Sequence, residues 1–219
     1  MKICPSIASG DVMNLQAQCL WLQEKYHHIH IDVEDGNYIN NITFGMKAVR
    51  GIFAATSCEK SVHLMVMNPL DYVEQLKELR PEIVFVHLDT SRYPSRVVDA
   101  FAQAGIRMGI ALNPAELPDR YEYLREQVQD VLLMMCEPDG YGQRYRKGLE
   151  KKVSKALCDG WNVWLDGGMS MEQAAAFGEQ GVCAVVLGRA VFETYCFESK
   201  KTLKQKDNGK RNNVKTVLQ

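Results

Sequence analysis

Two histidines and two aspartates in this sequence have the types and the surroundings expected of a divalent-metal site. His30 and Asp32 stand two residues apart in the apolar run HIHIDV, so on a strand their side chains project from the same face. His63 lies in SVHLM, and Asp166 ends the run VWLD just before two glycines. Imidazole and carboxylate ligands together suit zinc, iron, manganese or cobalt, and the sequence leaves that choice open.

Each of these residues also has an ordinary structural interpretation. A histidine on a strand is more often a satisfied core or surface residue than a ligand. Asp32 suits the cap of a loop, and Asp166 before two glycines suits a turn. The argument for a site is that all four residues end predicted strands. The other histidines lack this support, so we expect His27 and His28 to face solvent and His87 to lie behind the site at most.

The elements that would position these side chains are eight short apolar runs that alternate with longer segments of helical pattern. The predicted strands span residues 3–7, 29–33, 62–65, 83–87, 108–112, 131–135, 163–165 and 184–187. The predicted helices include residues 13–25, 69–79, 95–103, 149–157, 170–177 and 190–197. Asn68-Pro69 and Ser170-x-Glu172 are typical helix starts.

Buried strands that alternate with helices are expected to be parallel, because each crossover carries the chain back across the sheet. Eight such units in about 200 residues fit a closed (β/α)8 TIM barrel better than an open sheet, since one domain of that length is usual for such barrels. No GxGxxG follows the first strand to favour a dinucleotide-binding fold.

In such a barrel, function is built where the carboxyl ends of the strands converge. Glycines at that rim expose backbone N–H groups that suit a substrate phosphate, although a glycine more often only serves a tight turn. Arg189 and Arg144 are either additional phosphate ligands or surface residues. The glycine-bearing segments after the last three predicted strands are Asp139-Gly140-Tyr141-Gly142, Gly167-Gly168 and Gly188.

The composition of the sequence excludes several classes of protein. The 219 residues carry a net charge of -1, from 26 basic and 27 acidic residues, which gives no reason to expect binding to nucleic acid or an anionic membrane. No apolar run fits a secretion signal or a membrane span. Seven dispersed cysteines indicate reduced thiols in a cytoplasmic protein, and we expect all seven to be buried. We expect residues 1–197 to form the barrel and the lysine-rich residues 198–219 to form a solvated, mobile tail.

Seven segments resemble the successive signature segments of the ribulose-phosphate 3-epimerase family, in order and at similar spacing, over about residues 3–193. They are PSIASGD, HIDVEDGNYINNITFG, VHLMVMNP, GIALNPA, MMCEPDGYGQRY, WLDGG and VVLGRAVF. The segments INNITFGMK and EPDGYGQR are also similar to those of a divergent subgroup of sugar-phosphate epimerases from bacterial carbohydrate operons. The resemblance implies a ribulose-phosphate-binding barrel that assembles into a homo-oligomer.

The resemblance also implies the reaction and its residues. His30, Asp32, His63 and Asp166 would hold one divalent ion per subunit, and the two aspartates would be the acid/base pair. The reaction would be 3-epimerisation of a ketose phosphate, either ribulose 5-phosphate or a close relative such as a hexulose 6-phosphate. It would proceed by two-base proton transfer through an enediolate that the ion stabilises. Besides His63, the implied substrate contacts are Ser6, Met65, Met134, residues 139–142, Gly167, Gly168, Gly188 and Arg189.

The sequence departs from the family pattern at the site. Glu34 stands where the family usually has a methionine, and it would alter substrate choice, perturb the acid/base pair or point to water. The segment 139–142 replaces a Gly-Phe-Gly-Gly run, and Arg189 replaces a small hydroxyl residue. Two alternatives stay open: a sugar-phosphate sensor without catalysis, and a barrel lyase. The lyase alternative lacks the usual Asp-x-Lys-x-x-Asp cluster, since SVHLMVMN has no lysine.

Overall fold

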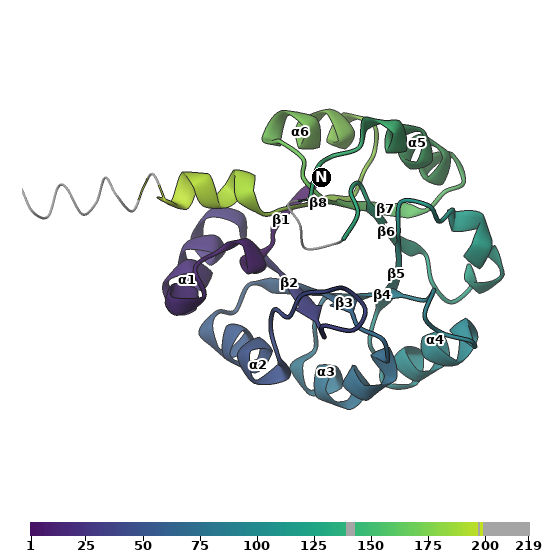
Figure 1. Cartoon of the computed structure of the whole chain (residues 1–219), viewed down its shortest axis with the longest axis horizontal. Helices are drawn as coiled ribbons and strands as arrows, with labels where there is room; N and C mark the ends of the chain where they lie inside the picture. Colours follow the sequence, from purple (N-terminus) through teal and green to yellow (C-terminus); the bar gives the residue numbers. More distant parts are fainter. Residues whose placement is uncertain (139–142, 197, 199–219) are drawn as a thin grey trace, which may run out of the picture.

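The computed structural model describes residues 1–138, 143–196 and 198. Eight parallel strands follow one another around a barrel in the order β1-β8-β7-β6-β5-β4-β3-β2 (Figure 1). An isolated bridge between Ser6 and His30 joins the two ends of this order. The strands are β1 (Lys2–Pro5), β2 (His28–Glu34), β3 (Glu59–Met65), β4 (Ile83–His87), β5 (Met108–Leu112), β6 (Asp130–Met134), β7 (Asn162–Asp166) and β8 (Ala184–Leu187).

Helices surround the strands on the outside of the barrel (Figure 1). They are α1 (Leu15–Tyr26), α2 (Met46–Ala55), α3 (Val73–Leu79), α4 (Pro94–Gln103), α5 (Glu150–Cys158) and α6 (Met171–Glu179). A 3-10 segment (Pro118–Leu124) occupies the crossover between β5 and β6, and residues 189–196 are helical after β8. The shorter 3-10 segments are Ile7–Ser9, Val12–Asn14, Pro69–Tyr72 and Lys147–Leu149. The predicted (β/α)8 TIM barrel is confirmed.

Two local predictions differ from the structure. The segment predicted as one helix over residues 69–79 starts with a 3-10 turn, and the side chain of Asn68 makes no capping hydrogen bond there. Helix α2, which has a clear apolar face, was not among the predicted helices. It follows a long loop after β2, and its N-cap residue Gly45 has no side chain to cap the helix, so the usual start signal is missing.

Apolar side chains form one layer inside the barrel and a larger one between the strands and the helices. Inside, the rings of Phe85 on β4 and Trp164 on β7 meet with their centroids 5.0 Å apart. The imidazole of His28 lies 6.2 Å from the same Trp164 ring and therefore belongs to the barrel interior. The polar side chains that β2 and β3 direct into the barrel thus pack against apolar residues of the interior, which hold the polar side chains in place.

Helix α6 starts with the predicted cap at Ser170. The hydroxyl of Ser170 accepts the backbone N–H of Gln173 at 3.2 Å, and the Gln173 side chain accepts the Ser170 N–H at 2.9 Å. This capping box satisfies two N–H groups that the helix leaves open. We expect Ser170→Ala to lower the free energy of unfolding by about 1 kcal/mol, measured by urea denaturation. Ser154→Ala, on the exposed face of α5, is the control and should change it by less than about 0.5 kcal/mol.

The prediction that all seven cysteines are buried is wrong. Cys158, Cys183 and Cys196 are exposed and Cys58 is partly exposed, because they lie at element ends or on outer helix faces, outside the alternation that buries strand residues. None of the helices in the described part of the chain is long and apolar enough to span a bilayer. The predicted tail, residues 198–219, lies outside the described residues except for Glu198, which accepts a hydrogen bond from the Trp21 indole.

Candidate active site and metal centre

The register of β2 against β3 brings the first three predicted ligands together. His30 is paired with Ser61 and Asp32 with His63, so three side chains of the same face meet near the carboxyl ends of the two strands. Asp166 reaches them from the end of β7. Both imidazoles are fully buried and both aspartates nearly so. One nitrogen or oxygen atom from each of the four side chains lies within 4.8 Å of the others.

Three atoms of this cluster, His30 Nε2, His63 Nδ1 and Asp32 Oδ1, are buried without a well-formed hydrogen bond among the described residues. Asp32 Oδ1 lies 3.4 Å from each of the two nitrogens, and His63 Nδ1 lies 3.6 Å from Asp166 Oδ2. Buried polar atoms are rarely left without a partner. Nitrogen and oxygen atoms that converge in this way, with three of them unsatisfied, fit a divalent cation of the transition series.

The two carboxylates shift the charge balance of the cluster. Burial by itself would raise the pKa of Asp32, but the charge of His30 and the contacts with both imidazoles hold this pKa well below its ordinary value. Burial by itself would lower the pKa of His63, but contacts with Asp166 and Asp32 raise it to about 9. Both shifts arise from the attraction between the carboxylates and the imidazoles, and the carboxylates favour positive charge at the point where these side chains converge, as a cation site requires.

The ring nitrogen of His63 that faces away from the other candidate ligands contacts a second buried histidine, His87. Nε2 of His63 lies 2.9 Å from Nε2 of His87, which is almost fully buried. If Nδ1 of His63 directs its lone pair at a cation, its proton is on Nε2 and is donated to His87. The proton of His87 is then on Nδ1, and oxygens of Asp89 and Glu116 lie within 4.8 Å of a nitrogen of this ring. This position of His87, behind the site, is the predicted one.

The prediction that His28 faces solvent is wrong, whereas His27 is exposed as predicted. β2 begins at His28, so the alternation of two that turns His30 and Asp32 inward also turns His28 inward. The same rule applied to the whole of β2 finds a fourth inward residue, Glu34.

A cavity of about 240 Å³ opens above Asp32 and Asp166 at the carboxyl ends of the strands. Ser6 lines it and donates its hydroxyl to Asp32 Oδ2 at 2.5 Å, which leaves Oδ1 of that carboxylate directed at the imidazoles. Sequence reasoning did not single out four polar residues of the lining. They are Ser9, Asn41, Thr43 and Gln143, and all four lie in segments that the family resemblance already marked.

Glu34 lines this cavity beside Asp32 and is 7% exposed. Its Oε2 accepts the amide of Asn41 at 2.6 Å. Thr43 supports the strand here, because its hydroxyl accepts the Glu34 N–H at 3.1 Å and donates to the Asp32 carbonyl at 2.6 Å. Burial and the nearby charge of Asp32 raise the pKa of Glu34 to about 7. The cavity thus contains a third carboxyl group, held in place by Asn41.

Two glycines and an arginine form part of the cavity wall after β7 and β8. Gly168 has a φ of +67°, and a side chain there would overlap the backbone of Gln143. A side chain at Gly188 would overlap the hydroxyl of Ser9. Arg189 donates from its guanidinium to the Gln143 carbonyl at 2.9 Å and lines the cavity. The wall therefore combines closely approaching backbone with a positive charge, an arrangement suited to an anionic group.

The remaining predicted contacts either do not line the cavity or lie outside the described residues. Gly167 has a φ of +117° and lies against Cys136, outside the cavity lining. Met65 and Met134 are buried and do not line the cavity either. Residues 139–142 lie outside the described residues, so the predicted contacts there have no structural description.

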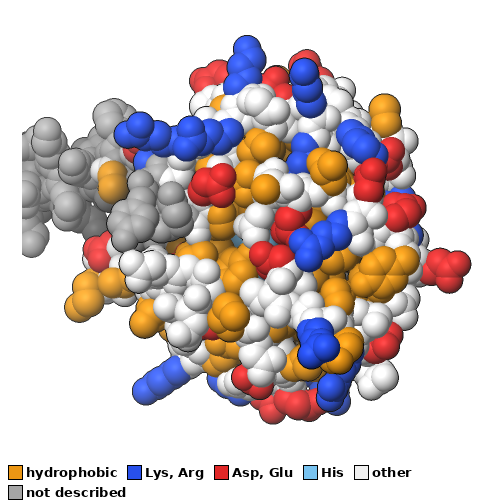
Figure 2. Space-filling model, turned by 45° about the vertical axis from the view of Figure 1, so that its right-hand side comes forward, with side chains coloured by type: hydrophobic (Ala, Val, Ile, Leu, Met, Phe, Trp, Pro, Cys, Tyr) orange, Lys and Arg blue, Asp and Glu red, His pale blue; other side chains and the backbone are white. Residues whose placement is uncertain are grey.

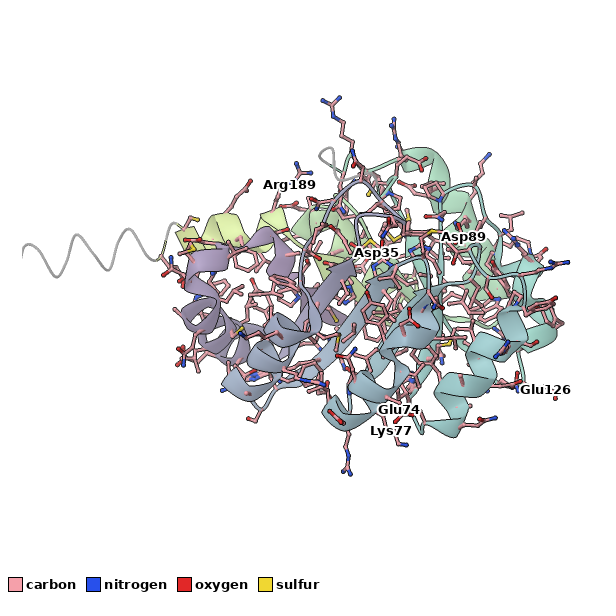
Figure 3. All side chains as sticks on the ribbon, turned by 60° about the horizontal axis from the view of Figure 1, so that its bottom comes forward. Asp35, Glu74, Lys77, Asp89, Glu126 and Arg189 are labelled. Carbon is pink, nitrogen blue, oxygen red and sulfur yellow. The ribbon has the colours of Figure 1, made fainter. Side chains whose placement is uncertain are left out.

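The rim of the barrel can be followed in Figure 3. Asp35 after β2, Asp89 after β4 and Arg189 after β8 lie on one side of the molecule, and Glu74 and Lys77 of α3 lie on the other. The loops that follow the strands therefore gather on the side where the cavity opens. On the face shown in Figure 2, acidic and basic side chains are interspersed, and neither sign covers a large area.

A closed parallel barrel with ionisable side chains converging on a cavity at the carboxyl ends of its strands defines a TIM-barrel enzyme. The sequence then gives the family. Residues 2–192 match the model of the ribulose-phosphate 3 epimerase family. The chain belongs to the ribulose-phosphate 3-epimerase family and is therefore an isomerase.

Relatives with this name are 27–32% identical to the chain over the aligned residues. The ribulose-phosphate 3-epimerase of Helicobacter pylori is 32% identical over 200 residues, which cover 89% of this chain and 92% of that protein. The chloroplastic ribulose-5-phosphate-3-epimerase of Arabidopsis thaliana is 32% identical over 206 residues, which cover 87% of this chain and 71% of that protein.

Solved structures support the fold alone. A mutant tryptophan synthase alpha-subunit from Pyrococcus furiosus aligns with a TM-score of 0.66 at 14% identity, over 88% of this chain and 89% of that chain. Phosphoribosyl anthranilate isomerase from Thermus thermophilus aligns with a TM-score of 0.62 at 20% identity, over 87% and 88% of the two chains. At these identities the likeness carries no information about substrate.

Proposed function

We propose that the protein is a metal-dependent epimerase that inverts carbon 3 of a ketose phosphate. The substrates would be ribulose 5-phosphate and xylulose 5-phosphate, or a close relative such as a hexulose 6-phosphate. One observation carries the proposal: Asp32 and Asp166 line the same cavity from strands that β1 and β8 separate, and both approach the buried His63. The relatives named for this reaction support it.

Epimerisation next to a ketone needs two groups that exchange a proton with carbon 3 from opposite faces. One carboxylate removes the proton while the acid form of the other returns one, and the roles of Asp32 and Asp166 exchange with the direction of the reaction. Ser6 orients Asp32 through its hydrogen bond to Oδ2. His30, His63 and the two aspartates would hold the divalent ion. When bound, the ion supplies charge stabilisation for the enediolate.

The phosphate of the substrate would bind at the wall that Gly168, Gly188 and Arg189 form. Backbone that approaches closely can offer N–H groups to the phosphate oxygens, and the guanidinium adds a charge-assisted bond. A phosphate held there, at a distance from the aspartates, contributes binding energy that positions carbon 3 between them.

The proposal is tested by following hydrogen exchange at carbon 3. Purified protein loaded with Mn²⁺, Co²⁺, Zn²⁺ or Fe²⁺ is incubated in deuterated water with a panel of five- and six-carbon 2-ketose phosphates. We expect deuterium at carbon 3 and formation of the epimer for at least one of them, measured by proton NMR. If no phosphoketose acquires deuterium at carbon 3 with any of these metals, the protein is not an epimerase of this kind. Binding without exchange would favour the sensor alternative.

Glu34 is proposed to set which ketose phosphate is preferred. A methionine at this position would remove a buried carboxyl group and its bond to Asn41, and hydrogen bonds to charged groups contribute about 1.5–3 kcal/mol. We expect Glu34→Met to change the ratio of kcat/KM between the best five-carbon and the best six-carbon substrate by about tenfold or more. Glu34→Gln keeps the shape and is the control. An unchanged ratio in Glu34→Met would show that Glu34 does not select the substrate.

Three expectations from the sequence remain predictions: a cytoplasmic location, a homo-oligomer and a solvated basic tail. The oligomeric state is measured by light scattering coupled to size-exclusion chromatography, where a monomer would contradict the second of them.

A further inference from the structure

A chain of buried polar side chains runs from His30 through the interior of the barrel, away from the cavity. Nδ1 of His30 lies 2.7 Å from Ser61 Oγ, and the same oxygen lies 2.9 Å from Nε2 of His28. All three residues are at most 1% exposed. The chain lies on the inward faces of β2 and β3, where the register places Ser61 opposite His30.

The far end of this chain is acidic. Nδ1 of His28 lies 3.4 Å from Glu82 Oε2 and 4.0 Å from Glu59 Oε2. The ammonium of Lys2 lies 2.7 Å from an oxygen of each of these glutamates. Glu82 Oε2 is buried and free of well-formed hydrogen bonds among the described residues, so an N–H directed at it from His28 is well placed. Because the ammonium of Lys2 already forms an ion pair with both carboxylates, we do not interpret this group as a second cation site.

The number of protons on these side chains fixes the direction of every hydrogen bond between them. For Nε2 of His30 to bind a cation, the proton of this ring must be on Nδ1, which then donates to Ser61 Oγ. The serine hydroxyl has a single proton, and it is donated to Nε2 of His28. The proton of His28 must therefore be on Nδ1, the nitrogen that faces Glu82. This single arrangement of protons gives each of these nitrogen and oxygen atoms a partner, and its last acceptor is the carboxylate of Glu82.

We propose that Ser61 and His28 are positioning residues that hold His30 in the tautomer and ring orientation required to bind the divalent ion. This inference rests on the metal centre of the proposed function. His28 suits the role because its ring is buried between Ser61 and Glu82, with Nε2 2.9 Å from the serine oxygen and Nδ1 3.4 Å from Glu82 Oε2. Groups that orient a metal-binding histidine in this way usually change metal affinity by about 10–100-fold when they are removed.

The effect should be specific to the hydroxyl of residue 61. Ser61→Ala leaves Nδ1 of His30 and Nε2 of His28 without a partner in the barrel interior, so His30 is free to adopt the other tautomer, in which Nε2 carries the proton. Ser61→Thr keeps an oxygen at nearly the same place and should retain the orientation. His28→Phe removes the acceptor for the serine proton while it keeps a ring against Trp164.

The test measures Co²⁺ binding rather than turnover. Metal-free wild type and each variant are titrated with Co²⁺ in competition with a chelator, and the visible absorption of the bound ion is recorded. We expect Ser61→Ala and His28→Phe to bind Co²⁺ about 10–100-fold more weakly than wild type and with altered visible bands. Ser61→Thr should stay within about threefold of wild type, because it retains the hydroxyl. His27→Phe, at the neighbouring exposed histidine, is the matched control and should resemble wild type.

The outcomes separate this inference from the proposed function. If wild type binds Co²⁺ and Ser61→Ala binds it equally well with the same spectrum, the positioning role is wrong and the metal centre stands. If wild type binds no Co²⁺, the metal centre is wrong and the positioning role is wrong with it. Urea unfolding of each variant shows whether it is folded. If His28→Phe does not fold, the Co²⁺ affinity of Ser61→Ala decides whether the positioning role is correct. Ser61→Ala removes only one buried oxygen atom.

Discussion

Replacing Asp166 or Asp32 by asparagine is expected to lower the rate of epimerisation by a factor of about 10²–10⁴ in both directions. Asparagine has the shape of aspartate and keeps one oxygen, but it cannot take up or return a proton at neutral pH. Each carboxylate serves one face of carbon 3, so losing either one interrupts the reaction. The measurement is kcat and kcat/KM for both epimers, with the bound metal of each variant determined by elemental analysis.

Hydrogen exchange tests the assignment more sharply than the rate does. In each variant one carboxylate remains, and it can still remove the proton that faces it. Asp32→Asn should therefore exchange the carbon 3 proton of one epimer with deuterated water, and Asp166→Asn that of the other. Asp99→Asn, on the exposed face of α4, is the control and should match wild type. If either variant exchanges the proton in both epimers at wild-type rates, the two aspartates do not act on opposite faces.

The sequence predicted the barrel well because its signals are local. Each strand is a short apolar run, and the regular alternation of strands and helices leaves few topologies. The four candidate ligands could be grouped for the same reason: they lie at or within two residues of the ends of the runs HIHID, SVHLM and VWLD, and a barrel brings all strand ends to one rim. The cluster His30, Asp32, His63 and Asp166 follows from that rule without any knowledge of loops.

What could not be predicted depends on contacts between distant segments. The bond between Glu34 and Asn41 requires a particular path of the loop after β2, which no periodicity encodes. Met65 and Met134 are the register partners of Glu34 and Asp166, yet they do not line the cavity, and no sequence pattern gives the extent of the cavity. His28 is a different case, because the alternation of two on β2 was sufficient to place it inside. Its partner Ser61 became visible only with the register of β2 against β3.

Removing the divalent ion is the second change with a large expected effect. A chelator should lower the epimerisation rate by at least about 10³-fold, since an ion of this kind contributes several kcal/mol to the stabilisation of the enediolate and each 1.4 kcal/mol is a factor of ten. Activity should return in proportion to added Mn²⁺, Co²⁺, Zn²⁺ or Fe²⁺ up to one ion per chain. Elemental analysis and activity, measured on the same samples, check both statements.

The ion should also stabilise the fold, because the cluster of His30, Asp32, His63 and Asp166 exists only in the folded chain. An ion present at 100 times its dissociation constant adds about 2.7 kcal/mol to the free energy of unfolding, so chelation should lower the melting temperature. His63→Ala is expected to lose both effects together, since it removes a central atom of the cluster, whereas His27→Ala, on the surface, should lose neither. Full activity after complete chelation would exclude a metal-dependent reaction, whatever the structure of the cluster.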